Sequence, residues 1–214
     1  MITLGFDTSG PWCGAALIVD GDCPAARYED MTKGQAERLM PMLQEVLAEA
    51  GAAWGDLDRI GVGIGPGNFT GVRISVSAAR GLALGLGVPA MGVTLLEALA
   101  YGTEGPVLAC LDARRGQGYF QRFGYGTAEP FLGSLDDLEP EPGLKCIGSL
   151  GAEAAAHLGA AHAPALYAPG SAIARIAARR SAAAPERPAP LYLRAADAAP
   201  PREAPPVILP ETLP

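Results

Sequence analysis

The sequence predicts an α/β fold made of two lobes with related topology, and three observations lead to this prediction. A strand that ends in an aspartate and a tight turn occurs twice, at Asp7 and at Asp112. Between residues 60 and 101, strand patterns alternate with helix patterns, as in sheets that are largely parallel. The length of 214 residues is enough for one large core or two small lobes.

The chain begins with a predicted antiparallel meander, and a long helix follows it. Strand patterns separated by turn residues lie at 2–6, 15–19 and 25–28. A helix pattern then runs from residue 32 or 34 to residue 50, and Pro41 should kink or divide it. Its apolar side is wide for a helix that packs on a single sheet. With Met40 and Met42 at its edges, this side is either ordinary core or an adaptable contact surface.

A buried strand at 60–64 leads into a glycine-rich loop and then into the start of a second helix. The loop contains Gly65, Pro66, Gly67, Asn68 and Gly71. Such a loop either points free helix amide groups at an anion or a partner, or simply makes a tight connection. It is not a Walker A loop because no Lys-Ser or Lys-Thr pair follows the glycines, and Thr70 replaces the third glycine of a dinucleotide fingerprint.

The helix that runs on from this loop to residue 86 is apolar nearly all round. Its only charges, Arg73 and Arg80, are seven residues apart and so share one face. Ser77, Gly81 and Gly85 form a stripe of small residues, which predicts a close approach of another helix because glycine is costly inside a helix. The helix is therefore expected to be buried on most sides, within the domain or by another chain.

The remaining patterns divide the chain into residues 1–104, a smaller lobe at 105–194 and a proline-rich tail at 195–214. Strands are expected at 88–93, 107–111, 118–123 and 144–148, and helices at 95–101, 152–158 and 172–180. From residue 185 on prolines recur, and only residues 191–194 and 207–209 look ordered.

Composition excludes several classes of protein. The net charge of −7 and the pI near 4.8 argue against a stand-alone nucleic-acid binder. The absence of a basic leader and of a long apolar run predicts no signal peptide, no membrane span and a cytoplasmic location. The four scattered cysteines are expected to be buried free thiols: Cys13, Cys23, Cys110 and Cys146. His157 and His162 are five residues apart, so they do not share a helix face and predict no metal site.

Asp7 has two interpretations that the sequence leaves open. Its carboxylate either orients a magnesium-bound phosphate or a water, or it caps its own backbone in an Asx turn.

Seven motifs together resemble the TsaB (YeaZ) family of bacterial tRNA threonylcarbamoyladenosine biosynthesis proteins. They are Phe-Asp-Thr-Ser at 6–9, Glu-Arg-Leu-Met-Pro-Met-Leu at 37–43, Gly-Pro-Gly-Asn-Phe-Thr-Gly-Val-Arg-Ile at 65–74, Gly-Leu-Ala-Leu-Gly at 81–85, Thr-Leu-Leu-Glu-Ala-Leu at 94–99, Asp-Ala-Arg-Arg-Gly at 112–116 and Pro-Leu-Tyr-Leu-Arg at 190–194. The resemblance covers almost the whole chain. One departure is Gly34-Gln35, where many relatives have a His-Ser or His-Thr pair, and this puts any side-chain role there in doubt.

The resemblance implies a two-lobed actin-like ATPase (ASKHA) fold with a reduced second lobe. It further implies a non-catalytic subunit that binds the catalytic paralogue TsaD, works with the ATPase TsaE, and forms a homodimer when TsaD is absent. tRNA would be bound only through that complex. No metal or cofactor is expected for the chain alone, and ATP or ADP would bind only at the interface of the complex.

The resemblance also assigns residues to two surfaces. The partner interface would contain Leu39, Met42, Leu43, Val46, Arg73, Ser77, Arg80, Gly81 and Gly85. A vestigial nucleotide site would contain Asp7, Thr8, Ser9, Gly65, Gly67, Asn68 and Thr70. Two other classes compete with this prediction: an ATP-dependent small-molecule kinase of the same fold, and a metalloprotease. The kinase would need a second phosphate loop where Ala-Arg-Arg follows Asp112, and the protease would need metal ligands that the sequence lacks.

Overall fold

The computed structural model describes residues 1–124, 126, 128–181 and 187–194. Its strands are β1 (Ile2–Asp7), β2 (Trp12–Val19), β3 (Asp22–Asp30), β4 (Arg59–Gly63), β5 (Ala90–Val93), β6 (Val107–Arg114), β7 (Gln117–Phe123), β8 (Phe131–Gly133), β9 (Lys145–Ile147) and β10 (Ala161–His162). Its α-helices are α1 (Gln35–Glu49), α2 (Phe69–Leu86), α3 (Leu95–Ala100), α4 (Gly151–Leu158) and α5 (Pro169–Arg179).

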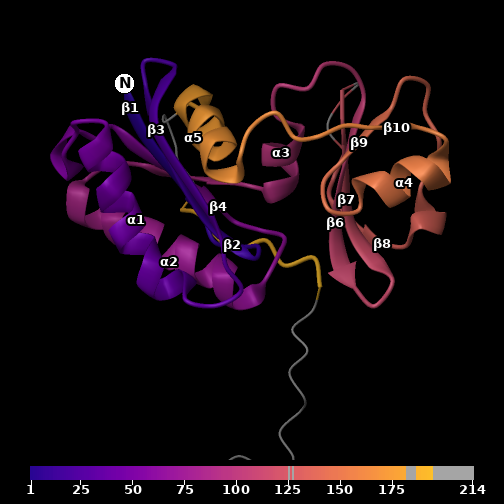
Figure 1. The fold of residues 1–214 in the computed structure, drawn as a ribbon, viewed down its shortest axis with the longest axis horizontal. Coiled ribbons are helices and arrows are strands. Elements are labelled where there is room, and N and C mark those ends of the chain that lie inside the picture. The colour runs from indigo at the N-terminus through magenta and orange to yellow at the C-terminus, as the bar shows by residue number, and fades with distance from the viewer. Residues whose placement is uncertain (125, 127, 182–186, 195–214) are drawn as a thin grey trace, which may run out of the picture.

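The described strands form two five-stranded sheets with the same topology. The first sheet has the order β3-β2-β1-β4-β5, and the second, taken from its other edge, has the order β8-β7-β6-β9-β10. In each sheet three antiparallel strands come first in the chain, and two parallel strands are then added beside the first of them. Figure 1 shows the sheets as two separate lobes. The predicted two-lobed α/β architecture with related halves is confirmed.

Most elements expected from the sequence are present with ends shifted by a few residues. The sequence missed β8 and β10, which have only three and two residues, too few for a periodic pattern. α1 is not divided at Pro41, and residues 191–194, predicted to be ordered, lie within the described part of the chain without forming a helix or strand. The predicted order at 207–209 lies outside the described residues, as does the tail at 195–214.

The division between the lobes differs from the predicted one. α1 and α2 cover one face of the first sheet, and α5 packs on β1, β2 and β4 (Figure 1). α5 lies within residues 105–194, which the sequence placed in the second lobe, so the chain returns to the first lobe after β10. The second sheet is covered by α4, while α3 contacts β6, β7 and α5.

Small residues allow α5 to lie directly on the first sheet. A Cβ at Gly5 would be 2.5 Å from the backbone nitrogen of Ala174, and one at Gly61 would be 2.7 Å from the Cβ of Ala177. Real side chains do not approach so closely. The two glycines of β1 and β4 are therefore required by the packing of the helix.

The four cysteines are free, as predicted, and Cys13, Cys110 and Cys146 are buried. The prediction of burial is wrong for Cys23, which is half-buried because it lies on the edge strand β3. None of the helices in the described ranges is long and apolar enough to cross a membrane.

We expect Arg59→Ala to lower the free energy of unfolding by about 2 kcal/mol, because a cation and its donors would be lost at a helix C-terminus. Nη1 of Arg59 donates to the carbonyl oxygens of Ala177 at 2.9 Å and Arg180 at 2.7 Å, which close the end of α5. Urea unfolding followed by circular dichroism measures the change. Arg175→Ala is the control, since Arg175 is half-buried like Arg59 but donates to the carbonyl oxygen of Gly21 and caps no helix end. Equal losses in the two variants would contradict the capping role.

Candidate functional site

The glycine-rich loop delivers the chain into α2, and its own asparagine caps that helix. Oδ1 of Asn68 accepts hydrogen bonds from the amide nitrogens of Thr70 at 2.9 Å and Gly71 at 3.1 Å. The amide of Asn68 donates to the carbonyl oxygen of Ser9 at 2.7 Å, and that of Val72 donates to Asn68. Four of the amide groups at this helix N-terminus, those of residues 68 and 70–72, are thus already bonded within the chain.

The same loop packs directly on the turn after β1. A Cβ at Gly67 would be 2.4 Å from the carbonyl oxygen of Ser9, and one at Gly71 would be 2.0 Å from that of Thr8. The hydroxyl of Thr8 donates to the carbonyl of Gly71 at 2.7 Å. The residues predicted for a vestigial nucleotide site are therefore brought together, but as two loops in backbone contact. This geometry favours the tight-connection interpretation of the glycines.

Asp7 is fully buried at this junction and makes the hydrogen bonds of an Asx turn. Its Oδ2 accepts from the amide of Ser9 at 3.1 Å, the hydroxyl of Ser9 at 3.0 Å and Nε1 of Trp12 at 2.7 Å. Its Oδ1 faces Gly63, where a Cβ would be 1.9 Å away, and no group among the described residues donates to it. Burial raises the pKa of Asp7, and the bonds from Ser9 and Trp12 offset only part of that shift.

We expect Asp7→Asn to raise the free energy of unfolding by about 1 kcal/mol at pH 7. A carboxyl whose pKa is higher in the folded state loses stability as the pH rises above its ordinary pKa of about 4. The asparagine keeps an acceptor for Trp12 and does not ionise. Unfolding measured from pH 3.5 to 8 should give curves that converge at the acid end and separate as the pH rises; a constant difference between them would show that charge is not the cause.

The turn after β6 is the second lobe's counterpart of the Asp7 turn, and it is a tight hairpin. Oδ1 of Asp112 accepts from the amide of Arg114 at 2.7 Å, and the amide of Asp112 donates to Oγ of Ser149 at 2.8 Å. Arg115 and Gly116, which join β6 to β7, both have positive φ, as a two-residue turn of this kind requires. Asp112 is exposed, in contrast to Asp7.

The interface predicted on α1 is corrected by the structure. Four of its residues are at most 1% exposed and belong to the core between α1 and the first sheet: Leu39, Met42, Leu43 and Val46. The wide apolar side of α1 is covered by its own sheet and by α2. These four side chains cannot contact a partner without unfolding the lobe.

The residues predicted on α2, by contrast, form one exposed helix face. Arg73, Ser77, Arg80, Gly81 and Gly85 all face solvent. A Cβ at Gly81 or Gly85 would meet nothing within 4 Å, so no element of the described chain explains these glycines. Leu84, which the sequence analysis did not assign to a site, lies on this face and is 84% exposed. Its position four residues after Arg80 was the signal that could have identified it.

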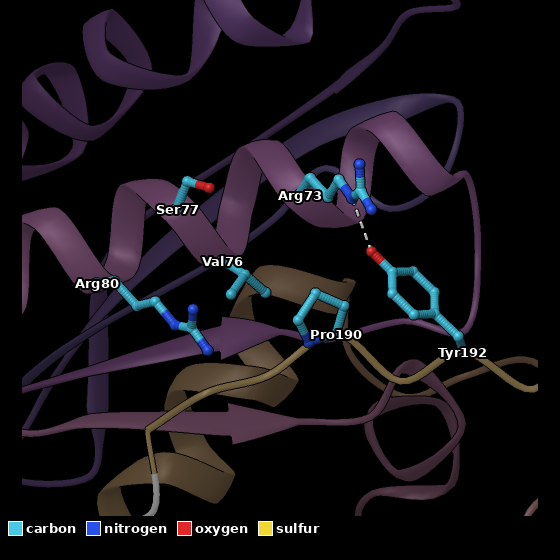
Figure 2. Close-up of a pocket in the computed structure, with 6 residues that line it drawn as sticks. All are labelled: Arg73, Val76, Ser77, Arg80, Pro190 and Tyr192. Atoms are coloured by element: carbon cyan, nitrogen blue, oxygen red, sulfur yellow. Dashed lines mark hydrogen bonds between the residues drawn. The ribbon is translucent and has the colours of Figure 1, made fainter. Parts of the chain in front are cut away.

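A second feature is the strap, residues 187–194, which runs alongside α2 and joins the two lobes. The sequence predicted order at 191–194 but not this position. The amide of Leu191 donates to the carbonyl of Ile64 at 2.8 Å, and Nη2 of Arg194 donates to Oε1 of Gln117 at 2.8 Å. Between these points the strap lies beside the exposed face of α2 (Figure 2).

An open groove of about 410 Å³ lies between α2 and the strap. Its lining consists of Arg73, Val76, Ser77, Arg80, Pro190 and Tyr192. Figure 2 shows the two arginines extending from α2 on either side of Val76, with Pro190 and Tyr192 forming the opposite wall. The groove therefore combines two cations with hydroxyl and apolar groups, and it continues the stripe of small residues along the helix.

Comparison with known proteins places this chain in a family. Residues 29–155, more than half of the chain, match the model of the family TsaD, tRNA N6-adenosine threonylcarbamoyltransferase. The chain belongs to this family.

Individual members of the family resemble the chain closely. The Escherichia coli tRNA threonylcarbamoyladenosine biosynthesis protein TsaB is 38% identical over 128 residues, which are 58% of this chain and 55% of the E. coli protein. The match thus spans about half the length of that relative. The YeaZ structure from Pseudomonas aeruginosa has a TM-score of 0.74 at 28% identity and covers 90% of this chain and 99% of that one. The resemblance to TsaB (YeaZ) that the motifs indicate is confirmed.

A more distant structure supports the fold class alone. Component A of the (R)-2-hydroxyglutaryl-CoA dehydratase of Acidaminococcus fermentans has a TM-score of 0.54 at 11% identity, and the match covers 83% of this chain and 97% of that one. Together with the YeaZ structure and the repeated sheet topology, it confirms the predicted actin-like ATPase fold.

Proposed function

We propose that this chain acts in tRNA threonylcarbamoyladenosine biosynthesis as a non-catalytic subunit. In this role it binds and supports the catalytic paralogue TsaD, together with the ATPase TsaE, in modifying the adenosine next to the anticodon. Support for the pathway comes from the name of the E. coli relative and from the family model. Support for the role of a subunit comes from one observation, the exposed face of α2.

The face of α2 has the properties of a helix-docking surface. Gly81 and Gly85 leave the backbone uncovered, and Leu84 adds a large apolar side chain that no described residue covers. A helix of TsaD can approach such a stripe closely, since small residues let two backbones come together. When TsaD is absent, we propose that the same face pairs with a second copy of this chain.

The site at the start of α2 supports the proposal that the chain has no catalytic role of its own. A kinase of this fold would hold phosphate between the Asp7 turn and the glycine-rich loop, yet these two loops contact each other through Gly67, Gly71 and the backbone of Thr8 and Ser9. Asp7 has its Oδ2 occupied by three donors. We propose that the chain alone uses no cofactor, that ATP or ADP binds only at the interface of the complex, and that tRNA is bound only through the complex in the cytoplasm.

Light scattering tests the proposal directly. The purified chain is mixed with TsaD from the same organism, and the mass of the product is read while ATP turnover of the chain alone is measured. The mass of a heterodimer, with ATP turnover at background, is the expected result. No complex, together with steady ATP hydrolysis by this chain alone, would overturn the proposal in favour of the kinase.

A further inference from the structure

The two arginines of the groove are held in place through one nitrogen each. Nε of Arg73 donates to the hydroxyl of Tyr192 at 2.9 Å (Figure 2), and Nε of Arg80 donates to the carbonyl of Pro188 at 2.7 Å. The guanidinium of Arg73 also stacks on the ring of Phe69, 3.8 Å from its centroid. The strap therefore orders both side chains before any ligand arrives, which lowers the entropy lost on binding.

No negative charge balances this pair of cations within the described part of the chain. The lining of the groove contains no carboxylate, and neither Arg73 nor Arg80 takes part in an ion pair there. The contrast with Arg38, which is bonded to both Glu29 and Glu45, is informative. In a chain of net charge −7, two arginines seven residues apart on one helix, with no ion pair among the described residues, mark a place for an anion.

The groove and the stripe of small residues are one continuous surface. Ser77 belongs to both, because it lines the groove and precedes Gly81 and Gly85 at four-residue spacing. A helix that lies along the stripe would pass over Ser77 between the two guanidinium groups. An open, partly apolar groove that continues a helix-docking face favours a protein side chain as the anion.

We propose that the Arg73–Arg80 groove receives a carboxylate side chain, an aspartate or glutamate, from the helix of TsaD that packs along α2. This inference rests on the proposed function and adds the electrostatic contact that sets the register of the two helices. The carboxylate accepts from the guanidinium nitrogens that the strap leaves free. Charge pairs at the centre of an interface fix register and orientation in this way.

The test compares charge with size at Ser77, an exposed residue that lines the groove. Ser77→Glu places a carboxylate four residues after Arg73 and three before Arg80, so it occupies the groove from within the chain. Ser77→Gln has nearly the same size and no charge. Binding to TsaD, measured by isothermal titration calorimetry, is expected to be at least about 10-fold weaker for Ser77→Glu than for Ser77→Gln. Equal affinities would overturn the proposal.

A second experiment reverses the charge of Arg80. Arg80→Glu is expected to weaken TsaD binding on the order of 100-fold, and changing one acidic residue of the TsaD helix to lysine should restore it. Lys145→Glu, in the second lobe, alters the net charge equally and should leave the affinity unchanged. If Arg80→Glu binds TsaD as the wild type does, the groove holds no partner carboxylate.

Two further outcomes separate this inference from the proposed function. If inorganic phosphate binds the chain alone and Arg80→Glu removes that binding without affecting the complex, the anion is a small molecule and the inference fails while the proposed function stands. If the wild-type chain forms no complex with TsaD, both fail.

Discussion

Replacing Gly81 with leucine is expected to abolish binding to TsaD while making the chain itself more stable. A Cβ at Gly81 meets nothing within 4 Å, so the fold accommodates the larger side chain. Leucine also favours a helix over glycine by about 1 kcal/mol. On the docking face, by contrast, the side chain would hold the partner helix away from the α2 backbone, and we expect an affinity loss of more than about 100-fold.

The two expected effects of Gly81→Leu have opposite signs: binding to TsaD is lost, while the isolated chain becomes more stable. Light scattering reads the complex, and thermal unfolding of the isolated chain reads the fold. Ala152→Leu is the matched control, because it also adds a leucine to an exposed helix position, but on α4 of the second lobe. Normal TsaD binding by Gly81→Leu, or an equal loss in both variants, would show that the α2 face is not the interface.

Gly5→Ala is expected to lower the free energy of unfolding by about 3 kcal/mol, the largest stability effect that we predict. The added methyl would lie 2.5 Å from Cβ and the backbone nitrogen of Ala174 and 2.6 Å from its Cα. Because backbone atoms are involved, no change of rotamer relieves the contact. The helix α5 or the strand β1 must shift, and both lie in the middle of the first lobe.

Differential scanning calorimetry measures this loss as a fall in Tm of roughly 6–12 °C for a chain of this size. Gly55→Ala provides the control, since a Cβ there meets nothing within 4 Å and its backbone does not have positive φ. We expect its Tm to stay within about 2 °C of the wild type. A comparable fall in both variants would mean that backbone flexibility, and not the contact with α5, accounts for the glycine.

The sequence predicted those parts of the candidate site for which helical periodicity is enough to show that residues share one face of a helix. On α2 the spacing of Arg73, Ser77 and Arg80 places them together, and the structure leaves that face exposed. On α1 the spacing likewise places Leu39, Met42 and Leu43 on one side, yet that side is buried against the sheet. A helical pattern identifies an apolar face without saying whether the chain's own sheet or a partner covers it.

The strap could not be derived from the sequence for a different reason. Residues 187–194 have no helical or strand periodicity, and their position depends on single hydrogen bonds to partners more than 70 residues away, such as Ile64 and Gln117. Tyr192 becomes part of the groove only because the strap brings it to Arg73. Contacts of this range leave no local trace in the sequence.

Local chemistry was therefore enough to predict most elements of this protein: alternating apolar residues for the strands, an apolar run after the glycine-rich loop for α2, and two strand–aspartate turns for a repeated fold. Only the tertiary structure decided that α5 returns to the first sheet and that the glycine-rich loop closes on Asp7 to Ser9. The physical reason is that strands and caps depend on neighbours a few residues away. Which face of a helix or strand is buried depends instead on the distant surface that packs against it. Gly5 and Gly61 leave room for α5, and the residues next to them in sequence do not indicate this contact.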